Sequence, residues 1–442
     1  MKDWREYYKS RICTAEEAVK CIKSGDSVVV GHACSEPQTL TRAMSERYQE
    51  LENVKVVHRV GQGRSLYVQP KMEGHFRHIS LFGGPSTRQA IAEGRADFIP
   101  RNISEIPELF TEGHIPLDVA LVTVSPPDEH GFCSLGISID YTLKAAKSAK
   151  TIIAQVNNHM PRTHGDSFLR VDEIAYFVPV DEPLIEIPRP EITEAEIAIG
   201  AYIADLIEDG STLQLGIGAI PDAILSSLKG KRDLGIHTEM FVDSMMKLFE
   251  RGIVTGRYKN IDRCKITFTF ALGSQRLYDF MRDNPLMASH CGRYTNNAKI
   301  IALNDQFISI NNTLMIDLYS QACSESAGTR QISGTGGQVD FVNGAWFSKG
   351  GKSFLCLSST FQDREGKINS RIVPTLPPGS IVTTPRTAID YIVTEYGMVQ
   401  LKGKSTWERA EALIGIADPR FQDDLVRQAQ EMNIWRRTQR IE

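Results

Sequence analysis

The stretch TEAEIAIGAYIADLIEDGSTLQLGIGAIPDAIL, residues 193–225, decides the fold. It predicts a helix with an acidic start, then Gly210, a strand, and a turn at Gly216 that opens a new helix. The stretch TAEEAVKCIKSGDSVVVGHACSEPQTL, residues 14–40, has the same order, and Gly25 and Gly31 have the same spacing as Gly210 and Gly216. This repetition predicts two similar α/β units that arose by duplication, with chance likeness of two helix and strand units as the alternative.

Strand-like runs alternate with helical patterns along the whole chain. The runs are rich in β-branched residues and cover residues 27–32, 54–60, 118–126, 151–156, 211–218, 265–273 and 380–384. This alternation predicts an α/β fold with largely parallel sheets. Pro183, Pro188 and Pro190 favour an extended crossing between the repeated units. We therefore expect two domains, 1–190 and 191–442.

Composition excludes several classes of protein. The formal net charge of −4 and pI near 6.2 give no general basic field, so we expect neither nucleic acid nor a membrane as a partner. The eight cysteines are scattered without a C-x-x-C pair, and the histidines lack metal-ligand spacing, so no metal is expected. The charged N-terminal segment MKDWREYYKSR is unlike a signal peptide, which predicts a cytoplasmic protein.

Two glycine-rich segments are candidates for ligand binding. In LQLGIGAIPDAIL, Gly216 and Gly218 stand between a predicted strand and a helix start, where backbone N–H groups are open to a ligand. In QISGTGGQVDFV, residues 331–342, the glycines are Gly334, Gly336 and Gly337. A plain strand-to-helix turn is the alternative for the first segment. A ligand long enough to touch both segments would explain the pair.

Two glutamates follow apolar strand-like runs. Glu239 ends the run LGIHTEM, residues 234–240, and Glu395 lies in YIVTEYG, residues 391–397. A solvated glutamate at a strand end is the alternative for each. Both glycine segments lie in the same half of the chain as Glu239, which favours a catalytic role for it.

Two further segments contain potential catalytic groups. SPPDEHGFCSLG, residues 125–136, holds Asp128, Glu129 and His130, and we interpret it as a proline-rich turn that forms a wall of the site. GHACSEP, residues 31–37, holds His32 and Glu36, which are candidates for lining a cleft between domains, with a structural histidine as the alternative. The chain has no G-x-S-x-G nucleophile elbow.

These segments resemble the acetyl-CoA hydrolase/transferase family of class I CoA-transferases. The resemblance runs nearly end to end and includes SPPDEHGFCSLG, LIEDGSTLQLGIGAIPDAIL, LGIHTEM, QISGTGGQVDFV and IVTEYGMVQLKGKS. It implies two similar α/β domains in one chain, a site in the cleft between them, and a homodimer or dimer-based oligomer. It also implies acyl-CoA and short-chain carboxylic acids as substrates, with no tightly bound cofactor.

The resemblance assigns roles to single residues. Glu239 matches the family's nucleophile, which attacks an acyl-CoA to give an acyl-glutamyl anhydride and then a glutamyl-CoA thioester. Glu395 matches a glutamate near the reacting centre. The residues that match CoA-binding positions are Gly216, Ile217, Gly218, Ala219, Ile220, Asn311, Gly334, Gly336 and Gly337. Gln362 stands where related members often carry a phosphate-binding lysine, with Arg364 and Lys367 as possible substitutes.

Three functions are compatible with this pattern. The first is transfer of CoA between acetate and a four-carbon acid, 4-hydroxybutyrate or butyrate. The second is hydrolysis of the same glutamyl intermediate by water, which differs only in how well the site excludes water. The third is a sensor of metabolites without catalysis, since fold does not fix function.

Overall fold

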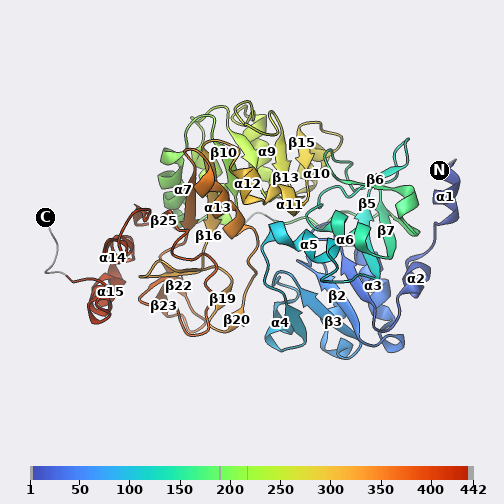
Figure 1. Cartoon of the computed structure of the whole chain (residues 1–442), viewed down its shortest axis with the longest axis horizontal. Coiled ribbons are helices and arrows are strands. Elements are labelled where there is room, and N and C mark those ends of the chain that lie inside the picture. The colour runs from blue at the N-terminus through green and yellow to red at the C-terminus, as the bar shows by residue number, and fades with distance from the viewer. Residues whose placement is uncertain (1–2, 189–190, 217, 437–442) are drawn as a thin grey trace.

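Two large β-sheets, each covered by helices, make up most of the computed structural model (Figure 1), which describes residues 3–188, 191–216 and 218–436. The expected boundary at residue 190 and the expected CoA-binding residue Ile217 lie outside the described residues. We call 3–188 the N-terminal half and 191–436 the C-terminal half.

The first sheet belongs to the N-terminal half and has the order β4-β3-β2-β1-β5-β7-β9, with every neighbouring pair parallel. Its strands are β1 (Ser27–Val30), β2 (Val54–His58), β3 (Phe76–Ser80), β4 (Ala96–Phe98), β5 (Val119–Val124), β7 (Thr151–Asn157) and β9 (Tyr176–Val180). The central strands β1 and β5 are buried along their whole length, as expected where helices cover both faces of a parallel sheet.

The second sheet belongs to the C-terminal half and has the order β15-β13-β11-β10-β16-β21-β25-β26. Only the β25–β26 pair is antiparallel. Its strands are β10 (Thr212–Leu215), β11 (Gly235–His237), β13 (Ile266–Phe268), β15 (Met287–Ser289), β16 (Phe307–Asn312), β21 (Lys352–Cys356), β25 (Tyr391–Thr394) and β26 (Gly397–Gln400).

The two sheets share one topology. In each, the chain enters at the centre (β1 or β10), adds three strands outward on one side, and then builds the other side from β5 or β16. In each half, a threonine capping box begins the helix before the central strand, Thr14 with Glu17 and Thr193 with Glu196. The predicted α/β class, with two similar and largely parallel units, is confirmed.

Helices fill the connections between strands and cover the sheets. The α-helices are α1 (Trp4–Ser10), α2 (Ala15–Ala18), α3 (Gln38–Glu46), α4 (Arg88–Ala92), α5 (Ile106–Thr111), α6 (Thr142–Ser148), α7 (Glu194–Leu206), α8 (Ala219–Ser227), α9 (Asp243–Glu250), α10 (Gln275–Met281), α11 (Gly292–Thr295), α12 (Ala298–Ile301), α13 (Gln338–Phe347), α14 (Thr406–Gly415) and α15 (Pro419–Glu431). Helices α1 and α15 lie at opposite ends of the long axis (Figure 1).

The C-terminal half carries an additional lobe that the repeat does not predict. It contains the hairpins β19–β20 (Ser326–Ala327, Arg330–Gln331) and β22–β23 (Thr360–Gln362, Ile368–Ser370) at the lower left of Figure 1. A separate apolar cluster joins α14 and α15 to β17 (Met315–Asp317) and β24 (Ile372–Val373).

One predicted strand is wrong. Residues 380–384 have no strand, and only Thr384 forms an isolated bridge, to Ala322. Ile381 and Val382 are 46% and 39% exposed, so the apolar pattern does not mark a buried strand here. Prolines at 377, 378 and 385 flank the segment and restrict it to irregular extended backbone.

Candidate active site

Glu239 lies in a break between two strands. The strand β11 belongs to the large second sheet, whereas β12 (Met240–Phe241) pairs with β14 (Phe270–Ala271) in a small sheet of its own. The carbonyl oxygen of Glu239 accepts hydrogen bonds from the N–H groups of Thr269, at 3.0 Å, and Phe270, at 3.1 Å. The break therefore fixes the backbone of Glu239 at the junction between the two sheets.

Two side chains donate hydrogen bonds to the Glu239 carboxylate. Arg59 Nη2 lies 3.0 Å from Oε1, and Asn296 Nδ2 lies 2.9 Å from Oε2. The Glu239 side chain is 14% exposed, so it is sheltered and still reachable. A carboxylate held by two donors in this way has a fixed orientation.

Arg59 is part of a buried polar chain in the N-terminal half. Its side chain is 3% exposed, and its Nη1 lies 3.2 Å from His32 Nε2. His32 Nδ1 lies 2.8 Å from Asp140 Oδ2. The rings of Phe82 and Phe270 lie 5.2 and 5.5 Å from the guanidinium carbon. This environment holds one cation between Asp140 and Glu239.

Burial and the neighbouring charges set the pKa values of His32 and Asp140. Burial lowers the pKa of His32 below its ordinary value. Burial alone would raise the pKa of Asp140, but His32 and Arg59 together hold it below its usual range. Asp140 therefore stays ionised and supports the positive charge of Arg59.

A cavity of about 140 Å³ opens beside Glu239. Its lining comes from Glu239 and Met240, from residues 333–338, and from the ends of β10 and β16. Phe82 lines it from the N-terminal half. The cavity thus lies at the carboxyl ends of parallel strands, where ligands bind in open α/β sheets.

Gly337 approaches the Glu239 carboxylate so closely that a larger residue would displace Glu239 or Asn296. A Cβ atom on Gly337 would lie 2.1 Å from both Glu239 Oε2 and Asn296 Nδ2. Gly337 is also the N-cap of helix α13, so the positive end of that helix faces the carboxylate. The site thus offers backbone dipoles and side-chain donors where negative charge would develop.

The first predicted CoA-binding segment is only partly at the cavity. Gly216 lines it, and a Cβ atom there would lie 3.1 Å from Asn311 Oδ1. Gly218 caps α8 with a φ of +124°, a conformation that favours glycine. Ala219 and Ile220 are buried in the first turn of α8, and neither they nor Gly218 line the cavity among the described residues.

The second predicted segment and Asn311 are all at the cavity. Gly334, Gly336, Gly337 and Asn311 line it. Asn311 is held by Gln214, whose Nε2 donates to Asn311 Oδ1 at 3.1 Å. The two glycine segments therefore meet across one space, as a shared ligand would require.

Glu395 does not line this cavity. It follows β25, and its Oε2 accepts the Ser359 N–H at 2.7 Å. Four strand spacings separate β25 from β11 in the sheet order, which corresponds to roughly 19 Å at about 4.8 Å per strand. A direct contact with Glu239 therefore does not follow from this arrangement.

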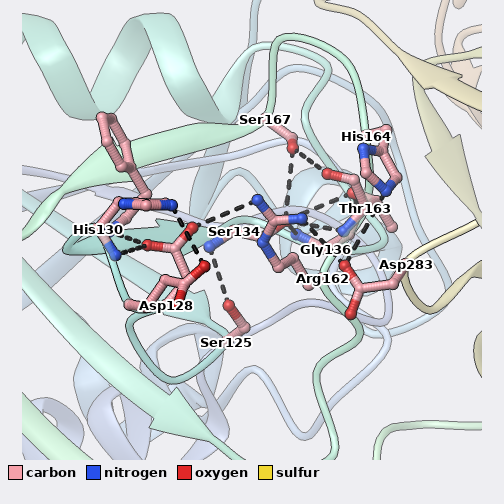
Figure 2. A network of polar contacts seen from close by, with 12 residues as sticks. Ser125, Asp128, His130, Ser134, Gly136, Arg162, Thr163, His164, Ser167 and Asp283 are labelled. Atoms are coloured by element: carbon pink, nitrogen blue, oxygen red, sulfur yellow. Dashed lines mark hydrogen bonds and ion pairs between the residues drawn. The ribbon is translucent and has the colours of Figure 1, made fainter. Parts of the chain in front are cut away.

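The segment SPPDEHG does not form a wall of the cavity, contrary to our expectation. Asp128 instead accepts the N–H groups of His130 and Phe132, and His130 is exposed. Figure 2 shows Arg162 between Asp128 and Asp283, at 3.3 and 2.9 Å. Because Asp283 belongs to the C-terminal half, this network joins the two halves away from Glu239.

Two contact residues of Glu239 were missed by the sequence analysis. Arg59 lies just past the end of β2, inside the run that we predicted as strand 54–60, and Asn296 follows the short helix α11. A charged residue at the end of an apolar strand is a signal that could have identified Arg59. Asn296 had no comparable signal.

The structure adds two observations on metals and membranes. Over residues 3–188, 191–216 and 218–436, no cluster of three or more His, Cys, Asp or Glu side chains is arranged to bind a metal ion. In the same part of the chain, no helix has the length and apolar character needed to span a membrane.

The fold and the site define an α/β protein of two similar halves with a glutamate at the cavity. Its sequence matches the acetyl-CoA hydrolase/transferase N-terminal domain over residues 1–187 and the C-terminal domain of the same name over 273–429. The chain belongs to the acetyl-CoA hydrolase/transferase family, as the sequence resemblance predicted.

Individual relatives agree with this assignment over almost the whole chain. The 4-hydroxybutyrate coenzyme A transferase of Clostridium kluyveri is 48% identical over 96% of this chain and 98% of its own length. The butyryl-CoA:acetate CoA-transferase of Anaerostipes caccae is 42% identical over 98% of this chain and 99% of its own length. The crystal structure of 4-hydroxybutyrate CoA-transferase from Porphyromonas gingivalis has a TM-score of 0.83 at 39% identity. The match covers 97% of this chain and 100% of that chain.

Proposed function

We propose that this chain is a CoA-transferase that moves CoA between acetyl-CoA and a short-chain acid, with 4-hydroxybutyrate as the leading acceptor. The observation that carries the proposal is the Glu239 carboxylate, which faces the cavity between the Arg59 and Asn296 donors and the start of α13. The relatives described above support transfer as the reaction class.

The reaction proceeds through Glu239. Its carboxylate attacks the thioester carbonyl, the carbon–sulfur bond breaks, and an acyl-glutamyl anhydride and CoA thiolate form. The thiolate then attacks the glutamyl carbonyl of the anhydride, which releases the carboxylate of the first acid and leaves a glutamyl-CoA thioester. A second carboxylate repeats these steps in reverse and leaves as the new acyl-CoA.

Residues around Glu239 support each step. Arg59 and Asn296 orient the attacking carboxylate, and they donate to the oxygen that becomes negative in each tetrahedral intermediate at the glutamyl carbon. The N-terminus of α13 adds a positive dipole at the same place. No proton has to be removed from an ionised carboxylate, so the nucleophile needs no general base.

The CoA moiety would extend along the two glycine segments. We place it against Gly216, Asn311 and residues 334–337, which line the cavity, with Gly218 to Ile220 supporting the turn behind them. Glu395, at the end of β25, and the exposed Arg364 and Lys367, on the β22–β23 turn, are candidates for contacts further along CoA. Contacts remote from the sulfur would contribute binding energy to the reacting centre.

The proposal also covers the domain boundary, the oligomeric state, the cellular location and the alternative acceptor. We place the domain boundary near residue 190, between β9 of the first sheet and α7 of the second half. We also propose that the protein is a homodimer and that it is cytoplasmic. Butyrate is the alternative acceptor, supported by the butyryl-CoA:acetate relative at 42% identity.

Intact-protein mass spectrometry tests the proposal. The protein is incubated with acetyl-CoA, reduced with borohydride and mapped by peptides, with 4-hydroxybutyrate or butyrate added in parallel samples. We expect a CoA-sized adduct, or its reduced product, on the peptide that contains Glu239, and its discharge by the acceptor acid as the new acyl-CoA appears. Hydrolysis of acetyl-CoA without discharge to either acid would overturn transfer in favour of hydrolysis.

A further inference from the structure

We propose that Ser104 and Asp340 form a clamp between the two halves that holds the 332–337 loop closed over Glu239 and keeps water from the glutamyl intermediate. Both are positioning residues, since they act through this loop. The inference rests on the proposed function, because it concerns how the same site divides its intermediate between transfer and hydrolysis.

The loop is held from outside by the N-terminal half. Gly83 N–H donates to the Ser333 carbonyl at 3.0 Å, and Ile103 N–H donates to the Gly336 carbonyl at 3.1 Å. The Gly83 backbone fits closely as well, since a Cβ atom there would lie 2.9 Å from the Ser333 oxygen. The loop itself lines the cavity from Ser333 to Gly337. The C-terminal half therefore supplies the loop, and the N-terminal half holds it by hydrogen bonds and close packing.

Ser104 and Asp340 make the side-chain part of this contact. Asp340 lies in the first turn of α13, and its Oδ1 accepts the Ser104 hydroxyl at 2.7 Å while its Oδ2 accepts the Ser104 N–H at 3.1 Å. Asp340 is 6% exposed, so solvent does not compete effectively for these bonds. Two hydrogen bonds to one buried carboxyl group fix the start of α13 relative to the N-terminal half.

The clamp acts on the reacting carboxylate through Gly337. Gly337 immediately precedes α13 and approaches Glu239 Oε2 without room for a methyl group. Movement of the α13 start away from Ser104 would therefore open the loop beside Glu239 and admit water. Water and a carboxylic acid compete for the same glutamyl thioester, so exclusion of water determines which product forms.

The clamp does not depend on ionisation of Asp340. Burial, with a smaller effect of the nearby Glu239 charge, raises the pKa of Asp340 to about 7. A neutral acid can donate its O–H to the Ser104 hydroxyl oxygen and accept the Ser104 N–H with its other oxygen. An asparagine can make the same two bonds, whereas alanine can make neither.

The test measures the rate of free CoA release relative to the rate of acyl transfer in full-length variants. We expect Asp340→Ala and Ser104→Ala each to raise this ratio about tenfold or more, since each variant loses at least one hydrogen bond of the clamp. Asp340→Asn should stay within about twofold of the wild type, because it retains both bonds. Asp283→Asn is the matched control, since it weakens the Arg162 contact between the halves far from the loop.

Hydrogen–deuterium exchange of the peptide covering 331–342 provides a readout independent of activity. Faster exchange in Asp340→Ala and Ser104→Ala, but not in Asp340→Asn, supports the clamp. An unchanged ratio in Asp340→Ala, or an equal rise in Asp283→Asn, overturns it. If the wild type transfers no CoA, the proposed function fails, and the exchange data alone decide whether Asp340 holds the loop.

Discussion

Arg59 Nη2 lies 3.0 Å from Glu239 Oε1, and the two residues follow strands of different sheets. Arg59 comes after β2 of the first sheet, and Glu239 comes after β11 of the second. The site is therefore complete only when both halves are packed together.

Glu239→Gln should lower acyl exchange by at least about a thousandfold, because the amide is not a nucleophile for the thioester. The side chain keeps its size and one oxygen acceptor, so CoA-thioester binding should remain close to that of the wild type. Steady-state exchange and calorimetric binding of acetyl-CoA are the measurements. Exchange that persists in this variant would remove Glu239 from the mechanism.

Arg59→Lys should lower kcat about 10- to 100-fold, the effect of losing one charge-assisted hydrogen bond to the carboxylate. A lysine cannot contact His32 and Glu239 with two nitrogens in the same fixed geometry. Arg77→Lys is the matched control, because Arg77 forms an exposed ion pair with Asp97 in the same half. Equal losses in both variants would assign the effect to folding.

Gly337→Ala should lower kcat about a hundredfold, because the added methyl group has to displace Glu239 or Asn296. Gly415→Ala is the control, since nothing lies within 4 Å of a Cβ atom at that helical position. Kinetics and thermal unfolding of both variants are compared. A fully active Gly337→Ala protein would contradict the close approach to Glu239.

The pH dependence of stability should show the buried Asp340. Burial raises its pKa from an ordinary 3.8 to about 7, so between pH 4 and 7 the native protein keeps a proton that the unfolded chain releases. The free energy of unfolding therefore falls as the pH rises through this window, by up to about 4 kcal/mol from this group.

Asp340→Asn cannot titrate and should lose this contribution. We expect the variant to gain stability relative to the wild type on going from pH 5 to pH 8, measured by unfolding midpoints at both values. Parallel pH profiles for the two proteins would show that Asp340 ionises normally in the native state.

Glu395→Gln should reduce exchange by about tenfold or less. Glutamine still offers an oxygen to the Ser359 N–H, so only the charge is lost, at a position away from the cavity. The measurement is kcat and KM for each substrate. A loss as large as that of Glu239→Gln would place Glu395 at the reacting centre.

The sequence was sufficient for the fold class because both halves repeat a local pattern. Thr14 and Thr193 cap helices in the same way, and the strands after Gly25 and Gly210 become the central strands β1 and β10. Hydrophobic periodicity and capping are encoded within a few residues, so they can be identified without tertiary information. The resemblance to the family was confirmed by the matches of residues 1–187 and 273–429 to its two domain models.

The rest of the site depends on contacts distant in sequence. Asn296 contacts Glu239 from 57 residues away, and Arg59 contacts it from 180 residues away. No periodicity or turn residue encodes such pairs, which arise only when the sheets pack. The predicted strand over 380–384 was wrong for a different reason, because its apolar residues are exposed and prolines at 377, 378 and 385 flank the segment.

The shared topology of the two sheets means that one site is assembled from two halves of the same architecture. The C-terminal half carries Glu239 and the glycine loop at the cavity, and the N-terminal half contributes the buried cation Arg59. Neither half therefore holds both the carboxylate and its cation. A fragment of either half expressed alone would present one member of this ion pair to solvent without its partner.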